Sequence, residues 1–174
     1  MGAYVFLDRD GTLIEDRHYT HRLEDYAPLP GAYAALRSLR EAGYGIVIVT
    51  NQSGIGRGYF KRADYERFEA HLEEDFARRG ARIDASYVCP HRPEAGCRCR
   101  KPAPGLIEQA CRDLDVDLAR SWVIGDKPID VELARNAGCR AIMVLSGQGR
   151  SGDVAADVEL AEDLLGAARR ILAG

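Results

Sequence analysis

Residues 4–12 read YVFLDRDGT, an apolar run that ends in two carboxylates separated by one arginine. The apolar part has the length and β-rich composition of a buried strand. Asp8 and Asp10 stand at its tip, and Gly11 lets the chain turn away. At this spacing the two side chains can share one Mg²⁺, or one can attack while the other, protonated, serves a leaving oxygen. Taken alone, the stretch also fits a solvated acidic turn.

Further apolar, β-rich runs follow this strand, and helix-like segments separate them. The runs cover residues 46–50, 86–89, 122–124 and 141–145. Helices are expected over residues 31–43, 61–79, 106–114, 131–137 and 164–172, where apolar side chains recur at helical spacing. This alternation predicts an α/β fold with a Rossmann-like, doubly wound parallel sheet, which binds its ligands at the carboxyl ends of the strands.

Polar groups follow every predicted strand except the last. Asp8, Thr50, Cys89 and Asp126 come directly at or after these ends. Residues 50–56, TNQSGIG, offer hydroxyls, amides and mobile backbone N–H groups suited to a phosphate, although a polar glycine-rich loop of no such function has the same composition.

Cations and further carboxylates lie later in the chain. Arg100 and Lys101 could neutralise phosphate charge, since Arg binds bidentately and Lys acts as a point charge. Asp126 offers a third carboxylate for magnesium. Asp130 fits equally a supporting position behind the metal ligands and an acid in the first turn of a helix.

Four soft ligands occur within the stretch 89–99. They are Cys89, His91, Cys97 and Cys99. Three thiolates and one imidazole form a closed tetrahedral zinc set, which is structural because no position is left for water. The sequence therefore predicts a zinc loop at about residues 89–101, and zinc would stabilise this Pro- and Gly-containing segment.

Composition limits the class of protein. The chain has 174 residues, 46% hydrophobic and 29% charged, with a net charge of −3 and five cysteines. We expect a single domain over residues 1–174, no polynucleotide partner because no basic field is present, and no disulfide framework. The first apolar run is too short for a signal peptide, and no run is long enough to cross a bilayer. A cytoplasmic monomer without membrane contact is expected.

Four stretches occur together in the order typical of the haloacid dehalogenase superfamily of phosphohydrolases. They are DRDGTLI (8–14), VTNQSGIGRG (49–58), CPHRPEAGCRCRKP (89–102) and IGDKPID (124–130). Within that superfamily the chain resembles the D-glycero-D-manno-heptose 1,7-bisphosphate 7-phosphatases over nearly its whole length. The resemblance implies a fold without a large cap domain, a Mg²⁺-dependent phosphatase, and a place in making nucleotide-activated heptose for surface polysaccharides such as lipopolysaccharide.

The resemblance also implies roles for individual residues. Asp8 would be the nucleophile and a Mg²⁺ ligand, and Asp10 the general acid and base with its carbonyl on the metal. Asp126 would be the third magnesium anchor. Substrate contacts would come from Asp16, Arg17, His18, Tyr19, Thr50, Asn51, Gln52, Ser53, Arg100, Lys101 and Lys127. Zinc would bind Cys89, His91, Cys97 and Cys99.

Three other functions remain open from the sequence. The segment between His91 and Cys97 is only five residues long, a compact form also similar to the histidinol-phosphate phosphatases. Residues 49–58 and Lys127 favour the heptose substrate. Polynucleotide 3′-phosphatases share a similar TNQ loop, but the zinc loop and the acidic balance argue against them. A non-catalytic zinc module that binds a sugar phosphate is disfavoured because Asp8, Asp10, Lys101 and Asp126 are all present.

Overall fold

The computed structural model describes residues 1–174 and confirms the predicted α/β fold. Six parallel strands form one sheet in the order β3-β2-β1-β4-β5-β6. The strands are β1 (Tyr4–Leu7), β2 (Gly45–Asn51), β3 (Ala85–Cys89), β4 (Trp122–Gly125), β5 (Arg140–Val144) and β6 (Glu159–Ala161). The short edge strand β6 was not predicted, since its three residues carry no periodic signal.

Helices connect the strands. They are α1 (Ala32–Glu41), α2 (Ser53–Arg57), α3 (Arg62–Arg78), α4 (Gly105–Asp113), α5 (Pro128–Ala137) and α6 (Leu164–Ala173). Single turns of 3₁₀ helix lie at Leu23–Asp25, Pro93–Ala95, Leu118–Arg120 and Ser151–Asp153. The glycine-rich stretch after β2, expected to be a loop, instead forms the short helix α2, which ends at Gly58 with a φ of 75°.

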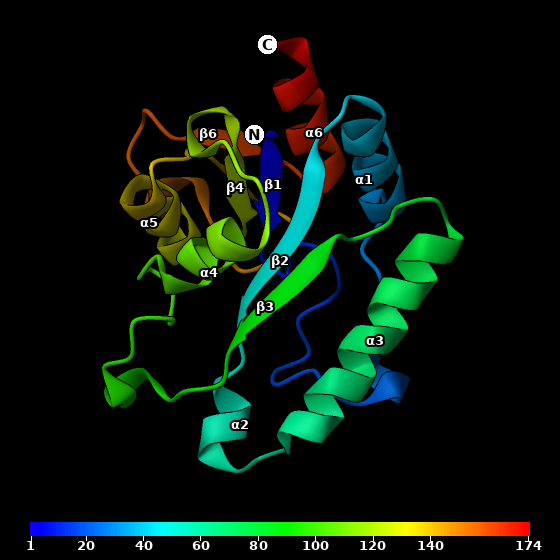
Figure 1. The fold of residues 1–174 in the computed structure, drawn as a ribbon, viewed down its shortest axis with the longest axis vertical. Coiled ribbons are helices and arrows are strands. Elements are labelled where there is room, and N and C mark those ends of the chain that lie inside the picture. The colour runs from blue at the N-terminus through cyan, green and yellow to red at the C-terminus, as the bar shows by residue number, and fades with distance from the viewer.

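The helices cover both faces of the sheet, as a doubly wound fold requires. Helices α1, α3 and α6 lie on one face and α4 and α5 on the other (Figure 1). Successive strand residues point to opposite faces, so Val5 and Leu7 join the core under the first group while Phe6 joins the core under the second. Burial on both faces explains why the strands read as continuous apolar runs. No large cap domain stands over this framework.

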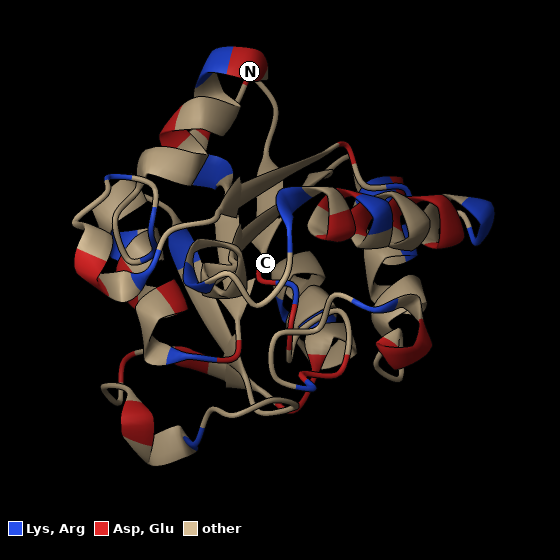
Figure 2. Cartoon of the chain, turned by 90° about the horizontal axis from the view of Figure 1, so that it is seen from below, with Lys and Arg blue, Asp and Glu red and all other residues tan.

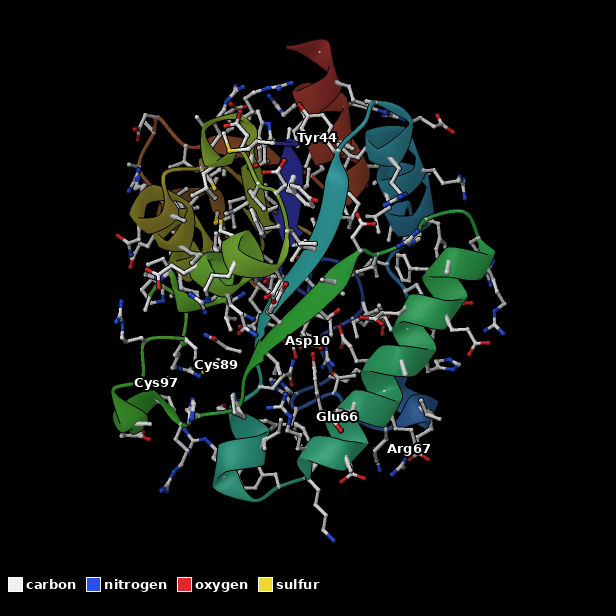
Figure 3. All side chains as sticks on the ribbon, viewed as in Figure 1. Asp10, Tyr44, Glu66, Arg67, Cys89 and Cys97 are labelled. Atoms are coloured by element: carbon white, nitrogen blue, oxygen red, sulfur yellow. The ribbon has the colours of Figure 1, made fainter.

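The strand register brings the polar tips together. β1 pairs with β2 on one side and with β4 on the other, with Leu7 opposite Ile48 and Ile124. From β1 the chain adds β2 and β3 on one side of the sheet and then β4, β5 and β6 on the other side. Such a switch point leaves a crevice beyond the carboxyl ends of β1 and β4. Asp10 and Cys89 lie toward this end of the molecule, and Tyr44 lies toward the opposite end (Figure 3).

The surface is mixed in charge. Seen from the side of the strands' carboxyl ends, Lys and Arg lie next to Asp and Glu along the helices and loops (Figure 2). No helix of the chain is both long enough and apolar enough to cross a membrane.

Candidate active site

Carboxylates from β1, β4 and the start of α5 converge at the crevice. Asp8 follows β1, and its backbone N–H donates to the carbonyl of Ile124 in β4 at 2.9 Å, so Asp126, two residues later, lies beside it. One oxygen each of Asp8, Asp126 and Asp130 lies within 4.8 Å of the others. All three residues are buried. The sheet therefore concentrates negative charge at one point.

Lys101 partly neutralises this charge. Its buried ammonium donates to Asp8 Oδ1 at 2.8 Å and to Asp130 Oδ1 at 2.7 Å. Asp130 also accepts from the backbone N–H of Lys127 at 3.2 Å, in the first turn of α5. Asp130 thus occupies both of the positions left open by the sequence: it is an N-terminal helix acid and it supports the cluster through Lys101.

Asp126 is the carboxylate whose surroundings best fit a cation. Its Oδ1 is buried and has no hydrogen-bond partner, while Oδ2 accepts from the backbone N–H of Gln148 at 2.8 Å. Burial, and next the charge of Asp8, raise the pKa of Asp126 to about 7. Burial also opposes ionisation of Asp8, but Lys101 and Lys127 outweigh it and lower the pKa of that group. The Lys127 ammonium lies 3.7 Å from Oδ1, beyond hydrogen-bond distance. A hard divalent cation would satisfy this oxygen and relieve the repulsion between the carboxylates, so these residues fit Mg²⁺.

The Asp10 carboxylate is held by Arg9 and Gln52. Arg9 donates to Asp10 Oδ1 at 3.0 Å, and the Gln52 amide donates to Oδ2 at 2.8 Å. Burial raises the pKa of Asp10 and the Asp8 charge adds to this, against the opposing effect of Arg9. The pKa values of Asp8 and Asp10 are thus moved in opposite directions, the pattern expected of a nucleophile and an acid.

The cysteine and histidine cluster lies beyond β3 at the same end of the sheet. The Cys89 sulfur is 3.6 Å from the Cys97 sulfur and 3.6 Å from His91 Nδ1. The Cys99 sulfur lies 3.2 Å from His91 Nδ1 and 3.5 Å from the Cys97 sulfur. A tetrahedron with Zn–S and Zn–N bonds of about 2.3 and 2.0 Å has edges of roughly 3.5–3.8 Å. The four free ligands therefore fit one zinc ion.

Comparison with known proteins agrees with this arrangement. Residues 98–167 match the HAD-hydrolase-like family. The chain is 40% identical to a D-glycero-β-D-manno-heptose-1,7-bisphosphate 7-phosphatase of Haemophilus ducreyi, over 90% of this chain and 91% of the relative, and 38% identical to that of Pseudomonas aeruginosa, over 84% and 83%. The chain belongs to this phosphatase family.

A solved structure of the family has the same fold. The D,D-heptose 1,7-bisphosphate phosphatase of Bordetella bronchiseptica, crystallised with magnesium and phosphate, superimposes with a TM-score of 0.90 at 35% identity and covers 98% of both chains. The corresponding enzyme from Burkholderia thailandensis gives a TM-score of 0.75 at 28% identity, over 99% of each chain.

The polar side chains of the TNQ stretch, residues 50–52, form hydrogen bonds within the phosphatase. Thr50 is buried at the end of β2, and its hydroxyl accepts from Gln52 Nε2 at 2.9 Å. The side chain of Asn51 bonds the backbone of Lys101 at both of its ends. Ser53 begins α2. The side chains of Asn51 and Gln52 are therefore occupied within the protein, by Lys101 and by Asp10.

The predicted sugar-contacting stretch forms a pinned loop at the rim. Asp16 accepts from the His18 backbone N–H at 3.0 Å, and its other oxygen lies 3.6 Å from the Lys127 ammonium. His18 and Tyr19 both have positive φ, 54° and 56°, a costly conformation for non-glycine residues that often marks functional sites. Tyr19 remains 43% exposed.

The two predicted arginine contacts lie at the surface. Arg17 pairs with Glu15 at 2.8 Å, and both side chains are about half exposed. Arg100 donates to the His91 carbonyl at 3.3 Å on the zinc loop. The structure thus brings together four of the predicted site residues and places Asp16 at the rim: they are Asp8, Asp126, Lys101 and Lys127. Arg17 and Arg100 instead bond within their own loops.

Two groups around the site were not found from the sequence. Arg9 is fully buried and ties Asp10 to Glu69 of α3, at 3.3 Å, and to the carbonyl of Thr20, at 2.6 Å. Its place between two aspartates was visible, but nothing local marked Glu69 as its partner. A long-range ion pair of this kind depends on the tertiary fold.

The second missed group is the loop after β5. Gly147 packs so closely on Asp126 that an added Cβ would lie 2.1 Å from its Oδ2. Gln148 Nε2 donates to Asp16 at 2.8 Å. This loop and the rim loop enclose a cavity of about 500 Å³, lined by Gly11, Glu15, Asp16, His18, Leu29, Ser146, Gly147 and Gln148. Gly147, three residues after the end of β5, was the only sequence feature that could have indicated this close approach.

Proposed function

We propose that the chain is a Mg²⁺-dependent phosphomonoesterase that removes the 7-phosphate of D-glycero-D-manno-heptose 1,7-bisphosphate through a phosphorylated Asp8. The observation that carries this proposal is the convergence of Asp8, Asp126 and Lys101 at the switch point of the sheet, where one buried oxygen of Asp126 has no hydrogen-bond partner and only the Lys127 ammonium at 3.7 Å. Family membership supports the substrate, since the relatives are named for it. We assign this activity to residues 1–174 acting as one domain.

The residues that would hold Mg²⁺ are Asp8, Asp126 and the backbone carbonyl of Asp10. When bound there, the ion neutralises phosphoryl charge and lowers the barrier of a transition state that spreads charge over the equatorial oxygens. Lys101, 2.8 Å from Asp8, adds a fixed positive charge to the same place. Preorganised positive charge is the main source of rate enhancement in such a site.

The first chemical step transfers the phosphoryl group to the protein. One carboxylate oxygen of Asp8 attacks phosphorus, the bond between phosphorus and the sugar oxygen breaks, and Asp10 gives its proton to that oxygen. The lowered pKa of Asp8 keeps it ionised for the attack, and the raised pKa of Asp10 favours its protonated form. The dephosphorylated sugar then leaves.

The second step regenerates the carboxylate. A water oxygen attacks the phosphorus of the aspartyl-phosphate, Asp10 accepts the water proton, and the bond to Asp8 breaks to release inorganic phosphate. Arg9 and Gln52 hold Asp10 at the same position for both proton transfers. Ester and water are consumed, and alcohol and phosphate are formed.

The zinc ion has a structural task in this proposal. Cys89, His91, Cys97 and Cys99 would saturate it, so no water could be activated there. The ion would fold the loop at the substrate entrance and hold the chain two residues before Lys101. We assign the half-buried Arg100 on this loop, and Lys127 beside Asp16, to the second phosphate of a sugar bisphosphate.

Phosphate release from a panel of substrates tests the proposal. Heptose 1,7-bisphosphate, histidinol phosphate and a 3′-phosphorylated oligonucleotide are compared with Mg²⁺ present and with the metal chelated. We expect the heptose to have the largest kcat/KM and chelation to abolish its turnover. Preferred turnover of histidinol phosphate or of the oligonucleotide would refute the substrate, and undiminished turnover after chelation would refute the magnesium site.

A further inference from the structure

Asn51, the last residue of β2, makes an unusual pair of contacts. Its Oδ1 accepts from the backbone N–H of Lys101 at 3.0 Å, and its Nδ2 donates to the carbonyl of the same residue at 3.2 Å. Lys101 belongs to no strand, so its peptide groups have no ladder partner. The Asn51 carboxamide therefore bonds both the N–H and the carbonyl of Lys101, as a neighbouring strand would do.

These two bonds matter because the Lys101 side chain ends in the carboxylate cluster. The buried ammonium reaches Asp8 and Asp130 at 2.8 and 2.7 Å. A lysine stem has several rotatable bonds, so the place of its charge depends on how firmly its backbone is fixed. Two hydrogen bonds on one residue fix both the position and the orientation of that backbone.

The end of β2 also holds the other end of the zinc loop. The backbone N–H of Gln52 donates to the carbonyl of Cys89 at 2.8 Å, and Asn51 pairs with Cys89 in the sheet register. The chain thus leaves β3 at Cys89, beside Asn51 and Gln52, and returns at Lys101 to Asn51. Asn51 therefore clamps both ends of the loop and Gln52 adds a bond at the Cys89 end, whereas the Cys and His side chains lie between these ends.

We propose that Asn51 is a positioning residue for Lys101 and does not act through a phosphate contact of its own. The inference rests on the proposed function, which gives Lys101 its role. Both ends of the carboxamide are occupied by Lys101, which leaves a single Nδ2 hydrogen for any other acceptor. A direct phosphate ligand would instead aim its donors into the crevice.

The test uses Asn51→Ala and Asn51→Leu, the second of which keeps the number and branching of the side-chain heavy atoms while removing both bonds. Asn136→Ala is the matched control, since it removes one exposed bond to the next carbonyl, that of Pro102, at 2.9 Å. Hydrogen exchange of the Lys101 amide, measured by NMR, should accelerate at least about tenfold in both Asn51 variants and stay within about twofold in the control.

Kinetics separate positioning from binding. We expect kcat on heptose 1,7-bisphosphate to fall about ten- to hundredfold in both Asn51 variants, with KM and the inhibition constant of inorganic phosphate within about twofold. In a Lys101→Met background, Asn51→Ala should have almost no further effect, because the group it positions is gone.

Three results would overturn the inference. They are unchanged Lys101 exchange in folded Asn51 variants, a loss expressed mainly in KM and phosphate inhibition, and a full additional loss in the Lys101→Met background. Hydrogen exchange of the Lys101 amide is measured without substrate, so it tests the Asn51 contacts independently of catalysis. An inactive wild-type chain would refute the proposed function and the positioning role together, whereas an active chain with unchanged exchange would refute only the latter.

Discussion

Two candidate metal sites lie at the same end of the sheet and are built in opposite ways. The cysteine and histidine cluster comes from one continuous stretch, residues 89–99, and lies largely outside the regular elements. The carboxylate cluster takes Asp8 from β1 and Asp126 and Asp130 from the segment after β4, and is buried in the framework. The first is a local site that a metal would order, whereas the second is a site that the fold itself orders.

This difference predicts a separation of effects. Losing a carboxylate oxygen should lower the rate of phosphate release and leave the fold intact, because the surrounding strands are stabilised by apolar packing on both faces of the sheet. Losing a thiolate should remove stability first, because little apolar surface supports the loop, whose residues 91–96 are exposed. Lys101 connects the two regions, since it lies two residues after Cys99 and bonds Asp8.

The largest effect is expected for Asp8→Asn. The substitution keeps the side-chain volume and removes the nucleophilic oxygen, so kcat should fall on the order of 10⁴-fold or more. Phosphate release measures it, and far-UV circular dichroism should be unchanged. Asp115→Asn, which alters a surface carboxylate paired with the N-terminus, is the matched control and should retain activity. Substantial turnover by the Asp8 variant would remove Asp8 from the mechanism.

A smaller effect, of a different kind, is expected for Cys99→Ser. Losing one thiolate should weaken zinc binding and lower the free energy of unfolding by roughly 3–5 kcal/mol. Metal analysis and thermal unfolding measure both quantities. Cys111→Ser is the control, because Cys111 lies on α4 outside the cluster and should leave the zinc content unchanged. A melting temperature unaffected by verified zinc loss would contradict a structural role.

The smallest effect concerns a carboxylate outside both regions. Asp75 on α3 accepts from the hydroxyls of Tyr26 and Tyr33. Burial opposes its ionisation, but the Tyr33 and Tyr26 hydrogen bonds and Arg79 outweigh it, so the pKa of Asp75 is lowered from its ordinary value. A lowered folded pKa gives stability that is present above the unfolded pKa and is lost as pH falls through the folded one.

Tyr33→Phe should therefore cost roughly 1–2 kcal/mol at neutral pH, and the difference from wild type should shrink as pH falls below about 4. Denaturant unfolding at several pH values measures it, with zinc kept bound. A difference that grows on acidification would refute the ionised, hydrogen-bonded state of Asp75 and would show that acid acts on this face in another way.

The contrast between the two sites also explains what the sequence could reveal. The grouping of the Cys and His side chains at 89–99 was predictable because zinc ligand sets recur at short, local spacing, and the structure brings these four side chains together. The strand ends Asp8 and Asp126 were readable because polar residues interrupt buried runs, and the alternating pattern implied that parallel strands share one edge. The doubly wound sheet followed from the same alternation, and all five predicted strands are present.

What the sequence could not reveal depends on contacts between distant segments. The short strand β6 forms because β5 offers an edge, and three residues carry too little pattern to announce this. The Arg9 ion pair with Glu69 spans two elements, and the Asn51 clamp spans fifty positions. Gln148 meets Asp126 only because the segment between β5 and β6 folds back over the crevice.

The central claim is that Asp8, held beside Asp126 and Lys101, becomes phosphorylated during turnover. The most direct measurement mixes the protein with heptose 1,7-bisphosphate and Mg²⁺, quenches the mixture rapidly in acid, reduces it with borohydride and locates the modified aspartate by peptide mass spectrometry. The account predicts modification at Asp8, absent after chelation of the metal and absent in Asp8→Asn. Label on a different residue, or turnover with no label on the protein at any time, would contradict it.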